Sequence, residues 1–212
     1  MQLKRFAILA AALFASFFPS AITTLAEELR APCVPLIACD PYFSVWSNTD
    51  ELADSFPVHW TGRIHALTSF VKVDGQNYRV MGKPTEFKTE KATQKSVSVR
   101  PTTTEYVFEA GGVELTLSFI RTTLPENLDA YSRPAVYIVW SAKSTDGAAH
   151  DVAVYFDQTA ELCVNNADQE VVAKRLETAN LNVLRFGTTE QPILAKKGDD
   201  LRIDWGSLYF AV

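Results

Sequence analysis

The sequence predicts an all-β fold, an antiparallel β-sandwich preceded by an irregular N-terminal segment. Two observations predict it. Several segments alternate apolar and polar residues with a period of two, as half-buried strands do, and turn-forming residues separate them at short intervals. No convincing amphipathic helix follows residue 26, which argues against the alternating strands and helices of an α/β protein.

Residues 1–26 predict a secretory signal peptide. Lys4 and Arg5 precede an apolar run over residues 6–18, and Ala26 ends a suitable cleavage site. The run is shorter than the roughly 20 residues that cross a bilayer, although an uncleaved anchor or a buried helix remains an alternative. We therefore expect a secreted or periplasmic protein that is not held by a membrane after cleavage.

Residues 27–60 are expected to be irregular, because four prolines interrupt them, and residues 61–212 are expected to form the sandwich domain. The prolines are Pro32, Pro35, Pro41 and Pro57. The first strand is predicted over residues 67–73, where every second residue shares one face. Asp74-Gly75 then predicts a hairpin to the run over residues 78–81.

The following strands are predicted in the same way. Gly111-Gly112 separates a strand at residues 106–108 from a strictly alternating one at residues 113–119. Residues 136–140 are apolar on both faces, which favours a central strand. Asp146-Gly147 turns the chain toward residues 152–156. Further strands are predicted at 170–175, 181–186 and 201–205, and residues 127–129 predict a helical turn at most.

Composition excludes some function classes. The chain has 212 residues, 47% of them hydrophobic, which is too many for a disordered tail. Lys and Arg number 20 against 25 Asp and Glu, and this acidic balance argues against a nucleic-acid partner.

Three cysteines, Cys33, Cys39 and Cys163, are too few for a disulfide-dense scaffold. Buried free thiols are the preferred interpretation, although a disulfide involving Cys163 remains open. The chain has neither Cys-x-x-Cys nor His-x-x-x-His spacing, so no metal site and no cofactor are predicted.

Several ordered motifs resemble the N-terminal region of the secreted glutaminase A-like family. The motifs are Asp40-Pro41-Tyr42-Phe43-Ser44-Val45-Trp46 within residues 31–47, His59-Trp60-Thr61-Gly62, residues 73–82, Ser132-Arg133-Pro134, residues 154–157, residues 168–172 and residues 191–205. The resemblance implies a supersandwich-like β-domain joined, in longer proteins, to a C-terminal helical domain of the six-hairpin type, where the active site is expected. It implies that the sandwich here is C-terminally truncated. A truncated reading frame, a fragment and one half of a split pair all remain open.

Five residues are candidates for ligand or domain-interface contacts: Asp40, Tyr42, Trp46, His59 and Trp60. Asp40-Pro41 is also a plain turn former, and aromatic side chains bury large areas in any small core. His59 is a candidate acid or base in a shared cleft, or a loop histidine held by hydrogen bonds. Asp157 and Glu161 lie four residues apart, which is roughly 13 Å in an extended strand and too wide for a glycosidase pair. No catalytic residue is assigned.

The resemblance implies an accessory sandwich that packs against the helical domain and shapes its cleft for a small-molecule substrate. In the full-length family the reaction is hydrolysis of glutamine to glutamate and ammonia, and this chain alone is expected to be inactive. A free-standing module for carbohydrate or another ligand is the alternative, and a self-contained hydrolase has the least support. A domain without its partner is expected to expose apolar surface, with contributions from Trp46, Trp60 or Trp205.

Overall fold

The computed structural model describes residues 31–84 and 89–212, and almost all of their regular structure is strand. The predicted signal peptide lies outside the described residues. The elements are β1 (Val34–Ala38), β2 (Ser44–Ser47), β3 (Leu67–Val73), β4 (Gln76–Met81), β5 (Glu90–Lys91), β6 (Thr93–Arg100), β7 (Thr103–Ala110), β8 (Val113–Arg121), α1 (Leu128–Tyr131), β9 (Val136–Ser144), β10 (Val152–Gln158), the 3-10 helix η1 (Ala160–Cys163), β11 (Val171–Glu177), β12 (Asn182–Thr188) and β13 (Leu208–Ala211).

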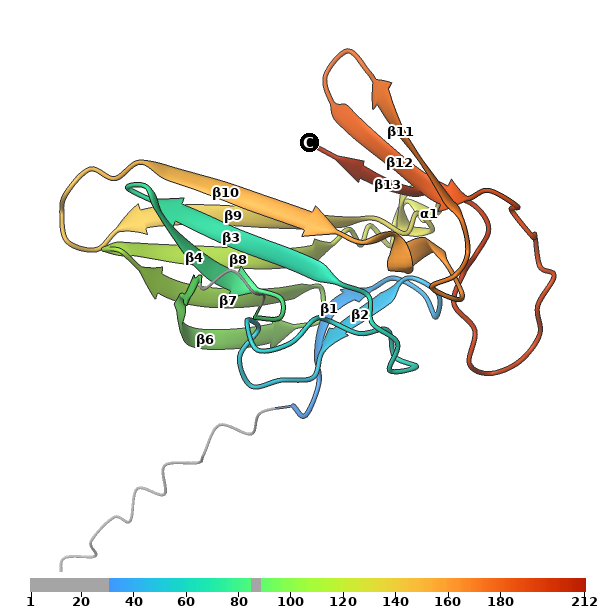
Figure 1. Cartoon of the computed structure of the whole chain (residues 1–212), viewed down its shortest axis with the longest axis horizontal. Helices are drawn as coiled ribbons and strands as arrows, with labels where there is room; N and C mark the ends of the chain where they lie inside the picture. The colour runs from blue at the N-terminus through green and yellow to red at the C-terminus, as the bar shows by residue number, and fades with distance from the viewer. Residues whose placement is uncertain (1–30, 85–88) are drawn as a thin grey trace, which may run out of the picture. The chain divides into compact units, whose positions relative to one another are not determined.

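Two four-stranded sheets form the sandwich, with the orders β10-β3-β4-β5 and β6-β7-β8-β9 (Figure 1). All their neighbouring strands are antiparallel except the short β4–β5 pair. The core between the sheets joins Val71 and Val73 of β3 with Tyr106 and Phe108 of β7 and with the inward side of β8. The all-β sandwich expected from the sequence is therefore confirmed.

The alternating segments give the strands expected of them. In β8 the four alternating apolar residues Val113, Leu115, Leu117 and Phe119 are all buried. Asp74 and Gly75 both have positive φ angles and join β3 to β4 in a two-residue hairpin, as the Asp-Gly pair predicts. Gly111 and Gly112, also at positive φ, join β7 to β8.

The segment expected to be irregular contains a hairpin. Within residues 27–60, β1 pairs with β2, and the register shifts between Pro35 and Ile37. Proline is tolerated there because this two-stranded sheet offers edges and a bulge where no N–H group is required. The hairpin belongs to the core, since Val34, Ile37 and Val45 are buried in it. The prolines alone therefore gave a wrong prediction for these strands.

The strand at residues 136–140 is an edge strand, not the central one expected. β9 ends its sheet beside β8 and has no neighbour on its other side among the described residues. Its outward side chains Tyr137 and Val139 are exposed. Its inward Trp140 and Ile138 are partly buried against the core. Apolar residues on both faces therefore indicate here a strand whose outer face is uncovered.

A third sheet, in the order β11-β12-β13, uses the C-terminal part of the chain. β11 and β12 confirm the strands expected near residues 170–175 and 181–186. The strand predicted at residues 201–205 does not form, and the last strand is β13 instead. The reason is that Arg202 and Asp204 are buried and their side chains bind other loops rather than alternating with a neighbouring strand.

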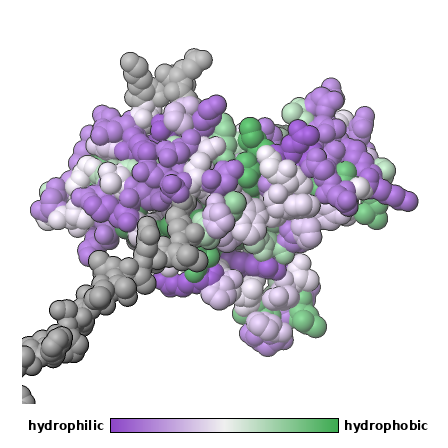
Figure 2. All heavy atoms as spheres, turned by 90° about the horizontal axis from the view of Figure 1, so that it is seen from below, coloured by the Kyte–Doolittle hydropathy of each residue, from purple (hydrophilic) through white to green (hydrophobic). Residues whose placement is uncertain are grey.

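The described residues hold no helix long and apolar enough to cross a membrane. On the face displayed in Figure 2, polar residues dominate and apolar residues form separate patches. Trp60 is exposed, and Trp46 and Trp205 are only partly buried.

Candidate functional site

The five residues singled out from the sequence lie close together around the β1–β2 hairpin. Asp40 and Tyr42 lie in its turn, and Trp46 lies on β2. His59 and Trp60 follow Val58, which makes an antiparallel bridge to Trp46. The backbone N–H groups of Trp46 and Val58 donate to each other's carbonyl oxygens at 2.7 and 2.9 Å. The structure thus extends the hairpin sideways by one bridge and brings all five residues to one region.

The carbonyl oxygen of Pro41 holds the loop against the hairpin turn. It accepts hydrogen bonds from Trp60 Nε1 at 2.7 Å and from His59 Nε2 at 2.9 Å. Because a carbonyl oxygen only accepts, Nε2 of His59 carries the proton. Nδ1 of His59 is then the acceptor and receives the backbone N–H of Thr61 at 3.3 Å.

His59 is fully buried, and burial lowers the pKa of its imidazole. The ring is therefore neutral near pH 7, with both nitrogens already occupied. This arrangement locks a loop and leaves no nitrogen free to move a proton. The geometry favours the hydrogen-bonded alternative for His59 over the acid–base one.

Asp40 also has a structural task. Its Oδ1 accepts the backbone N–H groups of Tyr42 at 2.8 Å and Phe43 at 2.9 Å. A carboxylate that bonds backbone N–H groups two and three residues later stabilises a turn. Asp40 therefore fixes the hairpin turn from which the Tyr42 ring projects.

An open apolar depression of about 460 Å³ lies beside this turn. Its walls include Cys39, Asp40, Pro41, Trp46 and Trp60. Trp60 is 54% exposed and the neighbouring Tyr42 is 44% exposed. Three of the five candidates thus line one surface, and it is suited to an apolar side chain or to the face of a sugar ring, which aromatic side chains bind by stacking.

A second cleft, of about 430 Å³, has a more polar lining. It is lined by residues 62–65, Glu161, residues 164–167 and Arg202. His65 lines this cleft and is 2% exposed, and neither ring nitrogen has a hydrogen-bond partner among the described residues. Burial lowers the pKa of His65 to about 3, aided by the unfavourable electrostatic effect of the neighbouring His59 and Arg202. Its ring is therefore neutral over the ordinary range of pH.

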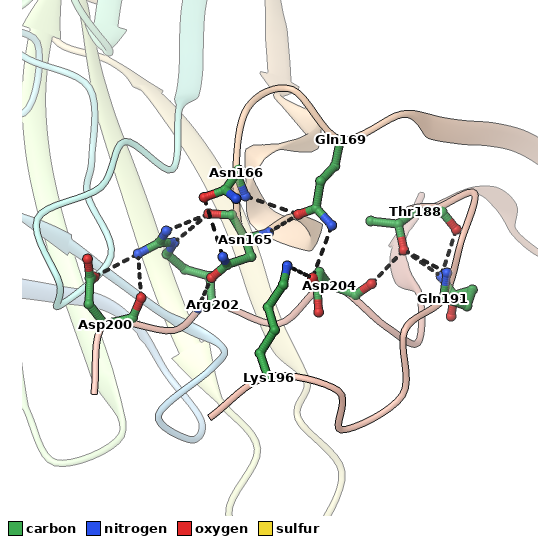
Figure 3. A network of polar contacts seen from close by, with 9 residues as sticks. All are labelled: Asn165, Asn166, Gln169, Thr188, Gln191, Lys196, Asp200, Arg202 and Asp204. Carbon is green, nitrogen blue, oxygen red and sulfur yellow. Dashed lines mark hydrogen bonds and ion pairs between the residues drawn. The ribbon is translucent and has the colours of Figure 1, made fainter. Parts of the chain in front are cut away.

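Arg202 connects the cleft to the C-terminal loop (Figure 3). Its Nε donates to the backbone oxygen of Asn165 at 3.1 Å, and its Nη1 donates to Asp200 Oδ1 at 2.7 Å. The backbone N–H of Arg202 donates to Asn165 Oδ1 at 3.0 Å. Spacing could not predict this contact, because 37 residues separate Arg202 from Asn165. The only sequence signal is that charged residues, Arg202 and Asp204, alternate with apolar ones at residues 201–205.

Asp204 forms the second half of the network in Figure 3. Its Oδ2 accepts Gln169 Nε2 at 3.0 Å and is paired with the Lys196 ammonium group. Its backbone oxygen accepts the hydroxyl of Thr188. The carboxylate is buried but compensated, so it stabilises the loop and is not available to a ligand.

The carboxylate pair Asp157 and Glu161 is not assembled for catalysis. Asp157 Oδ2 accepts the Tyr155 hydroxyl at 2.8 Å, whereas Glu161 Oε2 accepts the Thr159 hydroxyl at 2.7 Å. The extended geometry assumed for this pair does not hold, because β10 ends at Gln158 and Glu161 lies in η1.

All three cysteines are free. Cys163 is buried, Cys39 is partly buried and Cys33 is exposed, so the expectation of buried thiols is right for Cys163 and wrong for Cys33. Burial raises the pKa of the thiols of Cys39 and Cys163, which makes them poor nucleophiles. Within residues 31–84 and 89–212 no cluster of His, Cys, Asp and Glu could hold a metal ion.

Comparison with known proteins places these residues in a wider context. The family described as "Domain of unknown function (DUF5127)" matches residues 102–212, and a second, "Domain of unknown function (DUF4964)", matches residues 7–90. A protein named Glutaminase A, from Aspergillus oryzae (strain ATCC 42149 / RIB 40), is 27% identical over 191 residues. The match covers 86% of this chain and 27% of that relative. No solved structure matches the chain significantly.

Proposed function

We propose that this chain, which belongs to the family of the domain of unknown function DUF5127, acts as the accessory N-terminal β-sandwich of a secreted glutaminase-like amidohydrolase. The observation that carries the proposal is the similarity to Glutaminase A over 86% of the chain. The chain spans about a quarter of that relative's length. In this proposal the hydrolysis of glutamine belongs to a helical domain of the full-length protein, and the sandwich packs against that domain.

The geometry around the hairpin supports an accessory role. The candidate residues Asp40 and His59 have their polar atoms engaged in holding a turn and a loop. Exposed aromatic rings and an apolar depression lie next to them. Such a surface is suited to a protein partner or to one wall of a cleft, whereas a nucleophile with an adjacent base is not assembled there.

Two measurements test the proposal. DNA sequence after the codon for Val212 should encode a long helical region, directly or after one frameshift. An authentic stop followed by unrelated sequence would contradict the proposal.

In addition, purified residues 27–212 should release no ammonia from glutamine. Turnover that disappears in the Asp40→Asn or His59→Gln variant would instead show that the chain is itself the hydrolase.

A free-standing carbohydrate-binding module is the second candidate, because Trp60 and Tyr42 are exposed beside the apolar depression. It predicts that soluble oligosaccharides quench tryptophan fluorescence and that Trp60→Ala abolishes the quenching. The Val99→Ala variant is a matched control, because Val99 is an exposed apolar residue on β6. Saturable quenching in the wild type and the control but not in Trp60→Ala would favour this candidate.

A further inference from the structure

Three turns meet at the end of the sandwich that is farthest from β1 and β2, on the left in Figure 1. They are the β3–β4 turn, the β7–β8 turn and the crossover of residues 145–151 between β9 and β10. Backbone hydrogen bonds join them. The N–H of Asp74 donates to the oxygen of Asp151 at 2.9 Å, and the N–H of Thr145 donates to the oxygen of Gly112 at 2.9 Å.

His150 lies between two carboxylates at this point. Its Nδ1 is 2.7 Å from Asp74 Oδ2, and its Nε2 is 3.0 Å from Asp146 Oδ1. A neutral imidazole has one donor nitrogen and one acceptor nitrogen, and an ionised carboxylate only accepts. If the ring were neutral, one of these two contacts would set lone pairs against each other. Both contacts are favourable when His150 is an imidazolium ion.

The carboxylates are in the state that this requires. The hydrogen bond with His150 lowers the pKa of Asp74, and the backbone N–H of Ala148, followed by His150, lowers the pKa of Asp146. The same two hydrogen bonds raise the pKa of His150 above its ordinary value. Among the described residues Asp74 and Asp146 are the charged groups that face the ring. The β7–β8 turn, which also packs there, contributes only the uncharged Gly111 and Gly112.

We propose that His150 is a pH-sensitive clip that fastens the β9–β10 crossover to the β3–β4 turn in its charged form and releases it when the ring loses its proton. Each carboxylate also orders the backbone. Asp74 Oδ1 accepts the N–H of Asp151 at 2.9 Å, and Asp146 Oδ1 accepts the N–H of Ala148 at 2.8 Å. Release of the ring therefore loosens two identifiable amide groups. The clip is independent of the proposed function.

The clip is also tightly packed. A Cβ atom added at Gly112 would lie 2.5 Å from Asp146 Oδ2 and 3.2 Å from His150 Cε1. Gly112 has a φ of 79°, a conformation that glycine adopts without strain. The β7–β8 turn thus presses against the clip without contributing a charge to it.

Hydrogen exchange and NMR on residues 31–212 test the clip. Because the folded pKa of His150 is raised, its contribution is complete below about pH 6.5 and is lost as the pH rises through the folded value. We expect the protection factors of the Ala148 and Asp151 amides to fall about two- to fivefold across this titration. The amide of Gly62, which donates to the oxygen of His59 at 2.8 Å, serves as the internal reference and should not change.

Variants separate charge from packing. His150→Gln should lower both protection factors at every pH, whereas His150→Arg should keep them high and remove their pH dependence, because arginine stays charged. Lys143→Gln, which removes an exposed cation from β9, should behave as the wild type. The proposal is overturned by an NMR pKa of His150 at or below 6.5 in the wild type, and equally by unchanged protection in His150→Gln at pH 5.

Discussion

At the residue scale, two buried histidines and the carboxylate of Asp40 have structural roles that could not be assigned from the sequence. His59 and His65 lie with their ring centroids 4.9 Å apart, yet they differ in their surroundings. His59 has partners for both nitrogens, whereas His65 has none among the described residues. The cost of charging each ring is therefore a property of the fold and is absent from the unfolded chain.

His65 predicts a pH-dependent stability. With a folded pKa of about 3 and an unfolded value of about 6.5, the unfolded chain binds the extra proton between these limits. Stability is complete above about pH 6.5 and falls with the pH, at most by about 1.4 kcal/mol per pH unit. His65→Leu should remove this part of the slope. Urea unfolding from pH 4 to pH 7 measures it, and equal slopes in the two proteins would contradict the assignment.

Asp40 is predicted to contribute to stability through the hairpin turn, and Asp40→Asn provides the control. Asp40→Ala removes the acceptor of two backbone N–H groups, and because the turn is exposed we expect a loss of about 0.5–2 kcal/mol of unfolding free energy. Asp40→Asn keeps an oxygen acceptor and should restore most of it. Unfolding followed by tryptophan fluorescence reports on this region through Trp46 and Trp60. Equal losses in the two variants would show that charge, not the turn, is the cause.

At the element scale, alternation of residues identified strands well when their partners are close in the chain. β3, β4, β7 and β8 form from neighbouring segments with Asp-Gly and Gly-Gly turns, and the sequence predicts each of them. The prediction for β9 was wrong, because a central strand and an edge strand with an uncovered outer face both have apolar residues on their two faces. The prediction for residues 201–205 was wrong too, because a buried Arg and Asp mimic the polar half of an alternation.

The candidate site shows the same limit. Residues 40–60 are near one another in sequence, and the structure brings the five candidates among them to one region. Arg202 reaches this region from far along the chain, through Asn165 and, at 3.5 Å, through Thr61. No periodicity encodes such contacts, since they depend on how the loop between β12 and β13 packs against residues 165–169.

A substitution at Asp204, in the loop before β13, is predicted to reduce the stability of the protein. Asp204→Asn leaves the Lys196 ammonium without its ion pair and weakens the bond to Gln169, so we expect a loss of about 1–3 kcal/mol. Asp199→Asn, an exposed aspartate in the same loop, is the matched control and should change little. Limited proteolysis should cut residues 189–207 faster only in Asp204→Asn. Identical cleavage of the two variants would contradict the claim that the contacts of Asp204 hold this loop in place.

At the scale of the whole molecule, the two sheets of the sandwich end side by side in edge strands, β10 in one sheet and β9 in the other (Figure 1). An aromatic row lies along this side: the ring centroids of Trp140 and Phe156 are 5.5 Å apart, and those of Phe156 and Phe210 are 5.3 Å apart. The indole nitrogen of Trp140 is buried without a partner among the described residues. Val154 lies opposite the buried Val71 in the β10–β3 register and is 43% exposed.

This open side predicts weak self-association of the chain when nothing covers it. Unpaired edges and exposed apolar residues, among them Tyr137 and Val139 on β9, are the features that bring sheets together edge to edge. Sedimentation velocity over a range of concentrations should show reversible association, and Val139→Lys should reduce it because a lysine on an edge strand opposes pairing. Val99→Lys makes the same change on β6, at the opposite edge of the same sheet, and should have less effect. A chain that stays monomeric at high concentration, or equal effects of the two lysines, would mean that the β9–β10 side needs no cover, and the accessory role would lose its physical basis.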